Sequence, residues 1–180
     1  MTNFDDTNLD KCIFLGEAGA GKTSIINMLT KHKFKSNEIT DQIVIYETKQ
    51  FYIYDTPGFK SRYNRISNDI HIHDLKGIFL VIKYETRFES ILNKYYELTS
   101  AIPEEYEKKI VIIISHFDLS SNHQEDVQMI FKTLYEVGAT VMTCSKSFNA
   151  EDVANCMHLC MFHILKDNFH LNSSFFSKDI

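Results

Sequence analysis

The segment Gly16–Thr23, with the sequence GEAGAGKT, places the tightest constraint on how this chain folds. It matches the phosphate-binding pattern G-x-x-x-x-G-K-[ST], follows the apolar run Cys12–Leu15, and opens a helical pattern that extends from Lys22 to Leu29. Glycines let the backbone wrap so that successive N–H groups point at phosphate oxygens, and a helix N-terminus adds partial positive charge. We therefore expect a strand, a phosphate-binding loop and a helix in succession.

This loop predicts a nucleoside triphosphate that is bound together with Mg²⁺. Lys22 is expected to reach the β- and γ-phosphates, and the Thr23 hydroxyl is expected to bind the metal. The alternative is a glycine-rich turn without a ligand. The nucleotide-binding residues predicted in this segment are Glu17, Ala18, Gly19, Ala20, Gly21, Lys22, Thr23 and Ser24.

Apolar, strand-sized runs alternate with amphipathic helical stretches along the chain, which is typical of a parallel sheet covered by helices. After the first strand, the predicted strands are Ile43–Tyr46, Phe51–Tyr54, Ile78–Ile82, Ile110–Ile114 and Thr140–Thr143. A short polar turn joins the first two of these, so we expect them to pair antiparallel. Ile110–Ile114 is the most apolar run and is expected to be central. The predicted fold class is α/β, a three-layer P-loop NTPase fold with a mostly parallel sheet, one antiparallel edge strand and helices on both faces.

Length and composition suit a single domain, which we expect at residues 10–167 between tails at 1–9 and 168–180. Of the 180 residues, 44% are hydrophobic, enough to bury a core. The net charge of −5 argues against a dedicated nucleic-acid binder, which needs a basic face. Neither a signal peptide nor an apolar run long enough to cross a bilayer is visible. A cytoplasmic protein is therefore expected, whose association with membranes would need a partner.

The run Asp55–Gly58, with the sequence DTPG, follows the predicted strand that ends at Tyr54. A carboxylate at the carboxyl end of a strand beside a phosphate loop holds Mg²⁺ in Walker-B-type sites, so Asp55 is predicted to bind metal. Gly58 is expected to bring its N–H to the γ-phosphate and to swing away once that phosphate is lost. Thr40 is predicted as the third metal-binding residue, with Thr30 as its competitor and a plain strand-leading threonine as the alternative.

Ser115, His116 and Asp118 follow the most apolar strand, where GTPases place [NT]-K-x-D. An aspartate here accepts from the ring N–H and the exocyclic amine of guanine, so Asp118 predicts a guanine site; the alternative is an aspartate that starts a loop or caps a helix. The His116 ring can stack on the base in place of a lysine stem. After the last strand, Cys144-Ser145-Lys146 resembles the T-S-A-K loop, whose backbone N–H contacts the guanine carbonyl oxygen.

These motifs, in this order, resemble those of translation-factor-class GTPases. Within that class the chain resembles the GIMAP or avirulence-induced-gene (AIG) family, which is related to septins and Toc receptors. Three segments carry the resemblance. They are the D-T-P-G run, the S-H-F-D loop in place of T-H-x-D, and Gly77–Glu89, which is similar to the family's strand followed by a G-R-[FY]-T stretch. The chain departs from the family pattern at Ser115 and Thr86, and a Ras- or Rab-like assignment is the alternative.

The resemblance implies a GTPase (G) domain that switches between GTP and GDP with Mg²⁺. Ras-type hydrolysis uses a glutamine after D-x-x-G to orient water, and Phe59 stands there, so a monomer is expected to hydrolyse GTP slowly. Arg87 matches the family arginine and would stabilise the γ-phosphoryl charge across a GTP-dependent homodimer; the alternative is a solvated helix-start residue. The predicted catalytic residues are Lys22, Thr40, Gly58 and Arg87. Competing functions are a scaffold that binds GTP with little hydrolysis and a P-loop kinase or ATPase.

Overall fold

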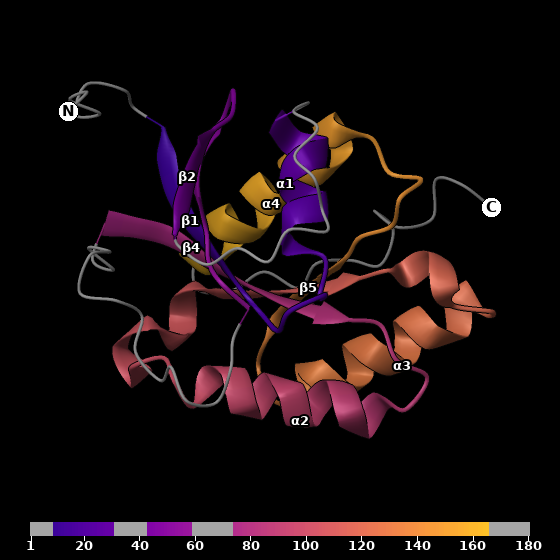
Figure 1. Cartoon of the computed structure of the whole chain (residues 1–180). Helices are drawn as coiled ribbons and strands as arrows, with labels where there is room; N and C mark the ends of the chain where they lie inside the picture. Colours follow the sequence, from indigo (N-terminus) through magenta and orange to yellow (C-terminus); the bar gives the residue numbers. More distant parts are fainter. Residues whose placement is uncertain (1–8, 31–42, 59–73, 166–180) are drawn as a thin grey trace.

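A computed structural model of the chain describes residues 9–30, 43–58 and 74–165 (Figure 1). In these ranges the strands form a six-stranded sheet in the order β2-β3-β1-β4-β5-β6. Its strands are β1 (Asp10–Leu15), β2 (Val44–Glu47), β3 (Phe51–Asp55), β4 (Leu75–Lys83), β5 (Ile110–Ser115) and β6 (Thr140–Thr143). The helices are α1 (Lys22–Thr30), α2 (Phe88–Thr99), α3 (His123–Tyr135) and α4 (Ala150–Leu165), with short 3₁₀ turns η2 (Glu104–Lys109) and η3 (Phe117–Leu119).

The sheet is parallel except at one edge. β1 pairs in parallel with β3 and with β4, and β5 pairs in parallel with β4 and with β6. β2 pairs antiparallel with β3, in a register that sets Val44 opposite Asp55. The prediction of a mostly parallel sheet with one antiparallel edge strand is confirmed, and β2 begins one residue later than expected.

Helices cover both faces of the sheet, which confirms the three-layer arrangement (Figure 1). α2 and α3 pack on one face, over a core that includes Leu80, Ile112 and Leu134. α1 and α4 pack on the other face, where Phe79 and Met157 are among the buried side chains. Each inner strand contributes to both cores because successive side chains point to opposite faces. This burial on both faces explains why the buried parts of β1, β4 and β5 are apolar at successive positions.

Two predictions about the strands are corrected. β5 is buried along its whole length, but it lies next to the edge strand β6, and β1 with β4 occupies the centre. Apolar character reports burial on both faces, and a strand beside an edge strand is buried as fully as a central one. β4 begins at Leu75, earlier than the predicted Ile78. The sequence does not reveal this start, because Lys76 and Gly77 belong to the strand but interrupt its apolar run.

Candidate nucleotide-binding site

The predicted site residues lie at one edge of the sheet. The parallel strands β1, β3, β5 and β6 end at Leu15, Asp55, Ser115 and Thr143, and parallel strands present their carboxyl ends on the same side. The loops that follow these strands carry the phosphate motif, the D-T-P-G run and the two base motifs. The fold therefore gathers at this edge four segments that are far apart in the sequence.

The phosphate loop owes its shape to glycines at positions that other residues fit poorly. Gly16 passes so close to β4 that an added Cβ would lie 2.3 Å from the carbonyl oxygen of Val81. Gly21 has a φ of 95°, in the region that side chains other than glycine rarely adopt. Between them, Ala20 N–H donates to the Glu17 carbonyl at 3.2 Å, and α1 follows directly after Gly21. The predicted strand, loop and helix are confirmed.

Lys22 folds back over the loop that precedes it. Its Nζ donates to the carbonyl oxygens of Gly16, at 2.8 Å, and Glu17, at 3.1 Å, and the residue is 6% exposed. Burial lowers the pKa of Lys22, while the charges of Asp55 and Glu17 oppose this shift. The ammonium group is thus held at the loop by carbonyl oxygens, which are the kind of partner that phosphate oxygens can replace.

Thr23 and Asp55, the two predicted metal-binding residues in the described ranges, are in contact. The Thr23 hydroxyl donates to Asp55 Oδ2 at 3.2 Å, and Asp55 is fully buried. The neighbouring Thr56 hydroxyl donates to the Phe14 carbonyl at 2.7 Å, which fixes the end of β3 beside β1. A hydroxyl and a carboxylate are hard oxygen donors of the kind that Mg²⁺ prefers, so this pair fits the predicted ion. Thr40, the third predicted metal-binding residue, lies outside the described residues.

Gly58 contacts the phosphate loop directly. A Cβ at this position would lie 2.7 Å from the backbone N and Cα of Ala18, so no larger residue fits without displacing the loop. The D-T-P-G run therefore lies against the loop and its helix at both of its ends, through Asp55 and through Gly58. Phe59, in the place of the water-orienting glutamine, lies outside the described residues.

The first base loop is tied to the phosphate loop by Ser115. Its hydroxyl donates to the Ala20 carbonyl at 2.5 Å and also lies 3.0 Å from His116 Nδ1. Which of the two atoms donates in the second contact is set by the tautomer of His116. The imidazole packs on the loop, since a Cβ on Gly21 would lie 3.0 Å from His116 Cε1. Burial lowers the pKa of His116, the charges of Lys83 and Lys146 add to this shift, and the charge of Asp118 opposes it.

Asp118, the predicted guanine acceptor, is exposed in a short turn between the buried residues Phe117 and Ser120. Phe117 is buried, and its ring contacts the rings of Tyr84, at 5.5 Å between centroids, and His123, at 5.3 Å. The hydroxyls of Tyr84 and Ser120 both donate to Asp126 Oδ2. The backbone around Asp118 is therefore held on both sides while its carboxylate faces solvent.

The second base loop is joined to the first by backbone hydrogen bonds. Cys144 N–H donates to the Ile114 carbonyl at 2.8 Å, and the Cys144 carbonyl accepts from Phe117 N–H at 3.2 Å. Ser145 is buried and Lys146 is exposed. The structure thus brings together the two segments that sequence reasoning assigned to the base.

Arg87, the remaining predicted catalytic residue, lies in the segment between β4 and α2. It immediately precedes α2, its side chain is exposed, and it makes no capping hydrogen bond to the helix. Sequence reasoning missed Lys94 on α2, whose Nζ lies 3.2 Å from Glu17 Oε2 and 2.5 Å from Glu85 Oε1. No motif marks Lys94, and its relation to the phosphate loop follows only from the folded positions of α2 and β1.

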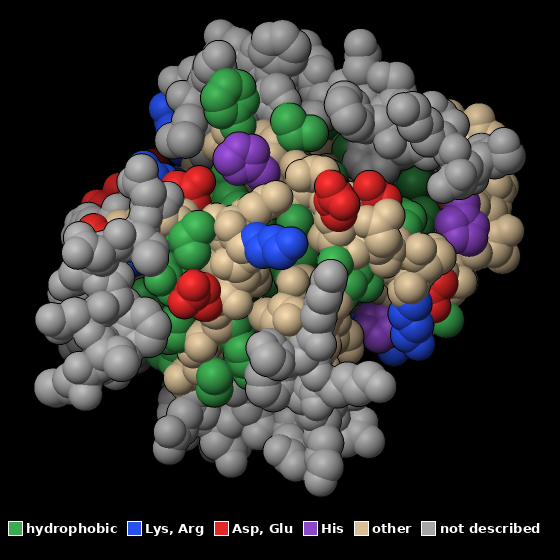
Figure 2. All heavy atoms as spheres, turned by 90° about the horizontal axis from the view of Figure 1, so that it is seen from above, with side chains coloured by type: hydrophobic (Ala, Val, Ile, Leu, Met, Phe, Trp, Pro, Cys, Tyr) green, Lys and Arg blue, Asp and Glu red, His purple; other side chains and the backbone are tan. Residues whose placement is uncertain are grey.

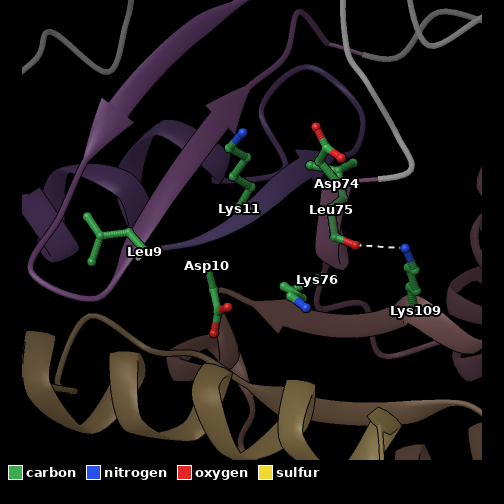
Figure 3. Close-up of a pocket in the computed structure, with 7 residues that line it drawn as sticks. All are labelled: Leu9, Asp10, Lys11, Asp74, Leu75, Lys76 and Lys109. Carbon is green, nitrogen blue, oxygen red and sulfur yellow. Dashed lines mark hydrogen bonds between the residues drawn. The ribbon is translucent and has the colours of Figure 1, made fainter. Parts of the chain in front are cut away.

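A hollow lies at the opposite edge of the sheet, at the amino ends of β1 and β4 (Figure 3). It has a volume of about 400 Å³, and Lys109 Nζ donates to the Leu75 carbonyl at its rim, at 2.8 Å. Its lining combines two leucines with charged residues of both signs: Leu9, Asp10, Lys11, Asp74, Leu75, Lys76 and Lys109. Figure 2 likewise shows small, interspersed groups of acidic and basic side chains on the face it displays. The hollow is separate from the phosphate loop, which lies at the carboxyl ends of the parallel strands.

A comparison with protein families agrees with the geometry. The model of a family described as 50S ribosome-binding GTPase matches residues 11–116, more than half of the chain. The match includes the phosphate loop and Asp55–Gly58, and it ends before Asp118 and Cys144. No curated protein matches the chain. None of the described helices has the length and apolar character needed to cross a membrane.

Proposed function

Because the chain belongs to the 50S ribosome-binding GTPase family and therefore carries a GTPase domain that binds guanine nucleotide, we propose that it is a Mg²⁺-dependent GTP/GDP switch. The observation that carries the proposal is the contact between Thr23 and Asp55 beside Lys22. A lysine, a hydroxyl and a buried carboxylate at one loop supply the charge and the oxygen donors that a metal–triphosphate complex requires. The domain comprises residues 10–167, and the protein works in the cytoplasm.

Each part of the nucleotide has its own partners in this proposal. Lys22 and the loop N–H groups bind phosphate oxygens, and Thr23, Asp55 and Thr40 hold Mg²⁺, which neutralises phosphate charge when bound. Gly58 N–H reports whether the γ-phosphate is present, and its close approach to Ala18 supports this role.

The guanine base has partners in both base loops. Asp118 accepts from the base, His116 stacks on it, and the loop at Cys144, Ser145 and Lys146 completes the base site. The backbone hydrogen bond between the Cys144 carbonyl and Phe117 N–H supports that assignment, because it holds the two loops side by side.

Hydrolysis in this proposal is slow in the monomer and faster in a GTP-dependent homodimer. Phe59 has no polar group to orient an attacking water, so the monomer lacks the group that Ras-type hydrolysis uses. Arg87 supports the dimer model because it is exposed and cationic, and so is available to a second molecule. Donated across an interface, it would stabilise negative charge that develops on the γ-phosphoryl group.

Within the GTPases, the sequence motifs favour a GIMAP- or AIG-type branch. His116 supports this, because the family pattern T-H-x-D has a histidine in the place of the usual lysine and the His116 ring contacts the phosphate loop; Ser115 departs from that pattern. Ribosome binding, which the family description names, is not part of the proposal. The net charge of −5 provides no overall attraction to RNA phosphates.

Single-turnover hydrolysis at increasing protein concentration tests the proposal. We expect the rate per molecule to rise with concentration, and Arg87→Ala to abolish the rise while leaving GTP binding unchanged. Glu89→Ala, at an exposed position two residues away, is the matched control and should behave as the wild type. A flat, near-zero rate for the wild type would instead support a scaffold that binds GTP and assembles with little hydrolysis. Preference for an ATP analogue would overturn the base assignment.

A further inference from the structure

The phosphate loop carries an acidic side chain of its own, on Glu17. The Glu17 carbonyl accepts a hydrogen bond from Lys22 Nζ, so this residue is part of the cradle of the phosphate-binding lysine. The charge of Glu17 also acts on the pKa of Lys22, in the direction that raises it. A carboxylate at this place repels phosphate and weakens the positive field that a nucleotide meets at the loop.

Lys94 compensates this charge from another element. It lies in α2, and its Nζ is 3.2 Å from Glu17 Oε2, so this side chain links the helix to the phosphate loop. Glu85, in the segment between β4 and α2, holds the same ammonium group at 2.5 Å. Burial opposes the charge on Lys94, but hydrogen bonds with Glu85 and Glu17 outweigh it and raise the pKa of Lys94. The lysine is thus charged and doubly anchored.

We propose that Lys94 is a positioning residue of the nucleotide site, which sets nucleotide affinity by neutralising Glu17 and holding its carboxylate away from the phosphates. The inference rests on the proposed GTP site and adds a residue outside its sequence motifs. Two features support it. Lys94 contacts the loop through its charged end, and its second anchor on Glu85 fixes the direction from which it approaches Glu17.

The effect of removing Lys94 should grow with the charge of the ligand. Without Lys94, the Glu17 carboxylate repels a triphosphate more strongly than a diphosphate. Lys94→Ala should therefore weaken binding of a GTP analogue about 2- to 5-fold at low salt, the range of a partly exposed ion pair, and weaken GDP binding less. Added salt should shrink both losses, because it screens charges at this degree of exposure.

A double-mutant cycle separates this charge effect from a structural one. Affinities for the GTP analogue and for GDP are measured for the wild type, Lys94→Ala, Glu17→Gln and the double variant. In the Glu17→Gln background, Lys94→Ala should have little further effect, because the charge that it neutralises is gone. Lys94→Arg keeps the cation and should restore most of the affinity. Lys132→Ala, at an exposed lysine in the last turn of α3, is the control and should leave affinity unchanged.

The outcomes distinguish this inference from the proposed function. A wild type that fails to bind GTP would overturn both. A wild type that binds GTP while Lys94→Ala matches the Lys132→Ala control would overturn the role of Lys94 alone. Equal losses for GTP and GDP, or an equal loss with and without the Glu17 carboxylate, would also contradict it, because those results indicate a general structural role for the lysine.

Discussion

Replacing Ser115 by alanine should loosen the link between the base loop and the phosphate loop. The Ser115 hydroxyl donates a hydrogen bond to the Ala20 carbonyl at 2.5 Å, and Ser115 is 3% exposed. The hydroxyl also lies 3.0 Å from His116 Nδ1. Ser115→Ala removes both contacts at once, without adding bulk, and leaves a buried carbonyl with one partner fewer. The change therefore removes the side-chain link between β5 and the phosphate loop, together with a longer contact of the same hydroxyl to the Ile82 carbonyl at 3.4 Å.

The expected cost follows from the burial of the groups involved. Leaving a buried polar group without its hydrogen bond costs about 1–3 kcal/mol, more than the net gain of an ordinary hydrogen bond. For a chain of this size each kcal/mol shifts the midpoint of thermal unfolding by about 2–4 °C. We therefore expect Ser115→Ala to unfold roughly 2–12 °C below the wild type. It should also bind GTP more weakly, since the Ala20 carbonyl belongs to the phosphate loop.

Urea unfolding followed by circular dichroism measures the difference in free energy, and Ser121→Ala is the matched control. Ser121 is exposed, so its variant should stay within about 0.5 kcal/mol of the wild type. If Ser115→Ala is as stable as Ser121→Ala and binds GTP equally well, the Ser115 hydroxyl does not connect the two loops in solution. That result would refute the structural role assigned to its contact with Ala20.

Two further predictions concern the loop and its histidine. Gly16→Ala should lower the free energy of unfolding by about 3 kcal/mol or more, because the new methyl group would lie 2.3 Å from the Val81 carbonyl oxygen. A free energy of unfolding within about 1 kcal/mol of the wild-type value would contradict this, because it would show that the backbone at Gly16 can move away from Val81 at little cost. His116 has a lowered pKa in the folded state, so the unfolded chain takes up a proton first as pH falls. The wild type should therefore keep the stability contributed by neutral His116 above the ordinary histidine pKa of 6.5, and should lose that contribution as pH falls through the lowered pKa of the folded state. His116→Gln should lose less free energy of unfolding over the same pH range. Equal pH profiles of unfolding for the two proteins would contradict the lowered pKa of His116.

The sequence determined the layout of the sheet more securely than the position of each strand in it. β1, the phosphate loop and β3 were predictable because glycines and apolar runs mark them locally. The position of β5 was not, because β4 and β5 are both apolar and periodicity does not rank strands across a sheet. The early start of β4 was hidden for a local reason, since Lys76 is exposed although it belongs to the strand.

Site residues followed the same division between local and long-range information. Thr23 and Asp55 were predicted from motifs that are 32 residues apart, and the structure brings them into contact. Lys94 carried no motif, because its role depends on where α2 packs. Phe117 occupies the variable position of the S-H-F-D loop, so no motif marks it, although its ring anchors that loop against Tyr84. The roles of Thr40 and Arg87 stay predictions.

Calorimetric titration of the protein with GDP, a GTP analogue and an ATP analogue in the presence of Mg²⁺ tests the central claim most directly. We predict binding of both guanine nucleotides and a clear preference over the ATP analogue. Lys22→Ala should weaken binding of the triphosphate, and Asp118→Asn should remove the preference for guanine. Equal binding of the ATP and GTP analogues, or guanine binding that survives both substitutions unchanged, would contradict a guanine-nucleotide site at this loop.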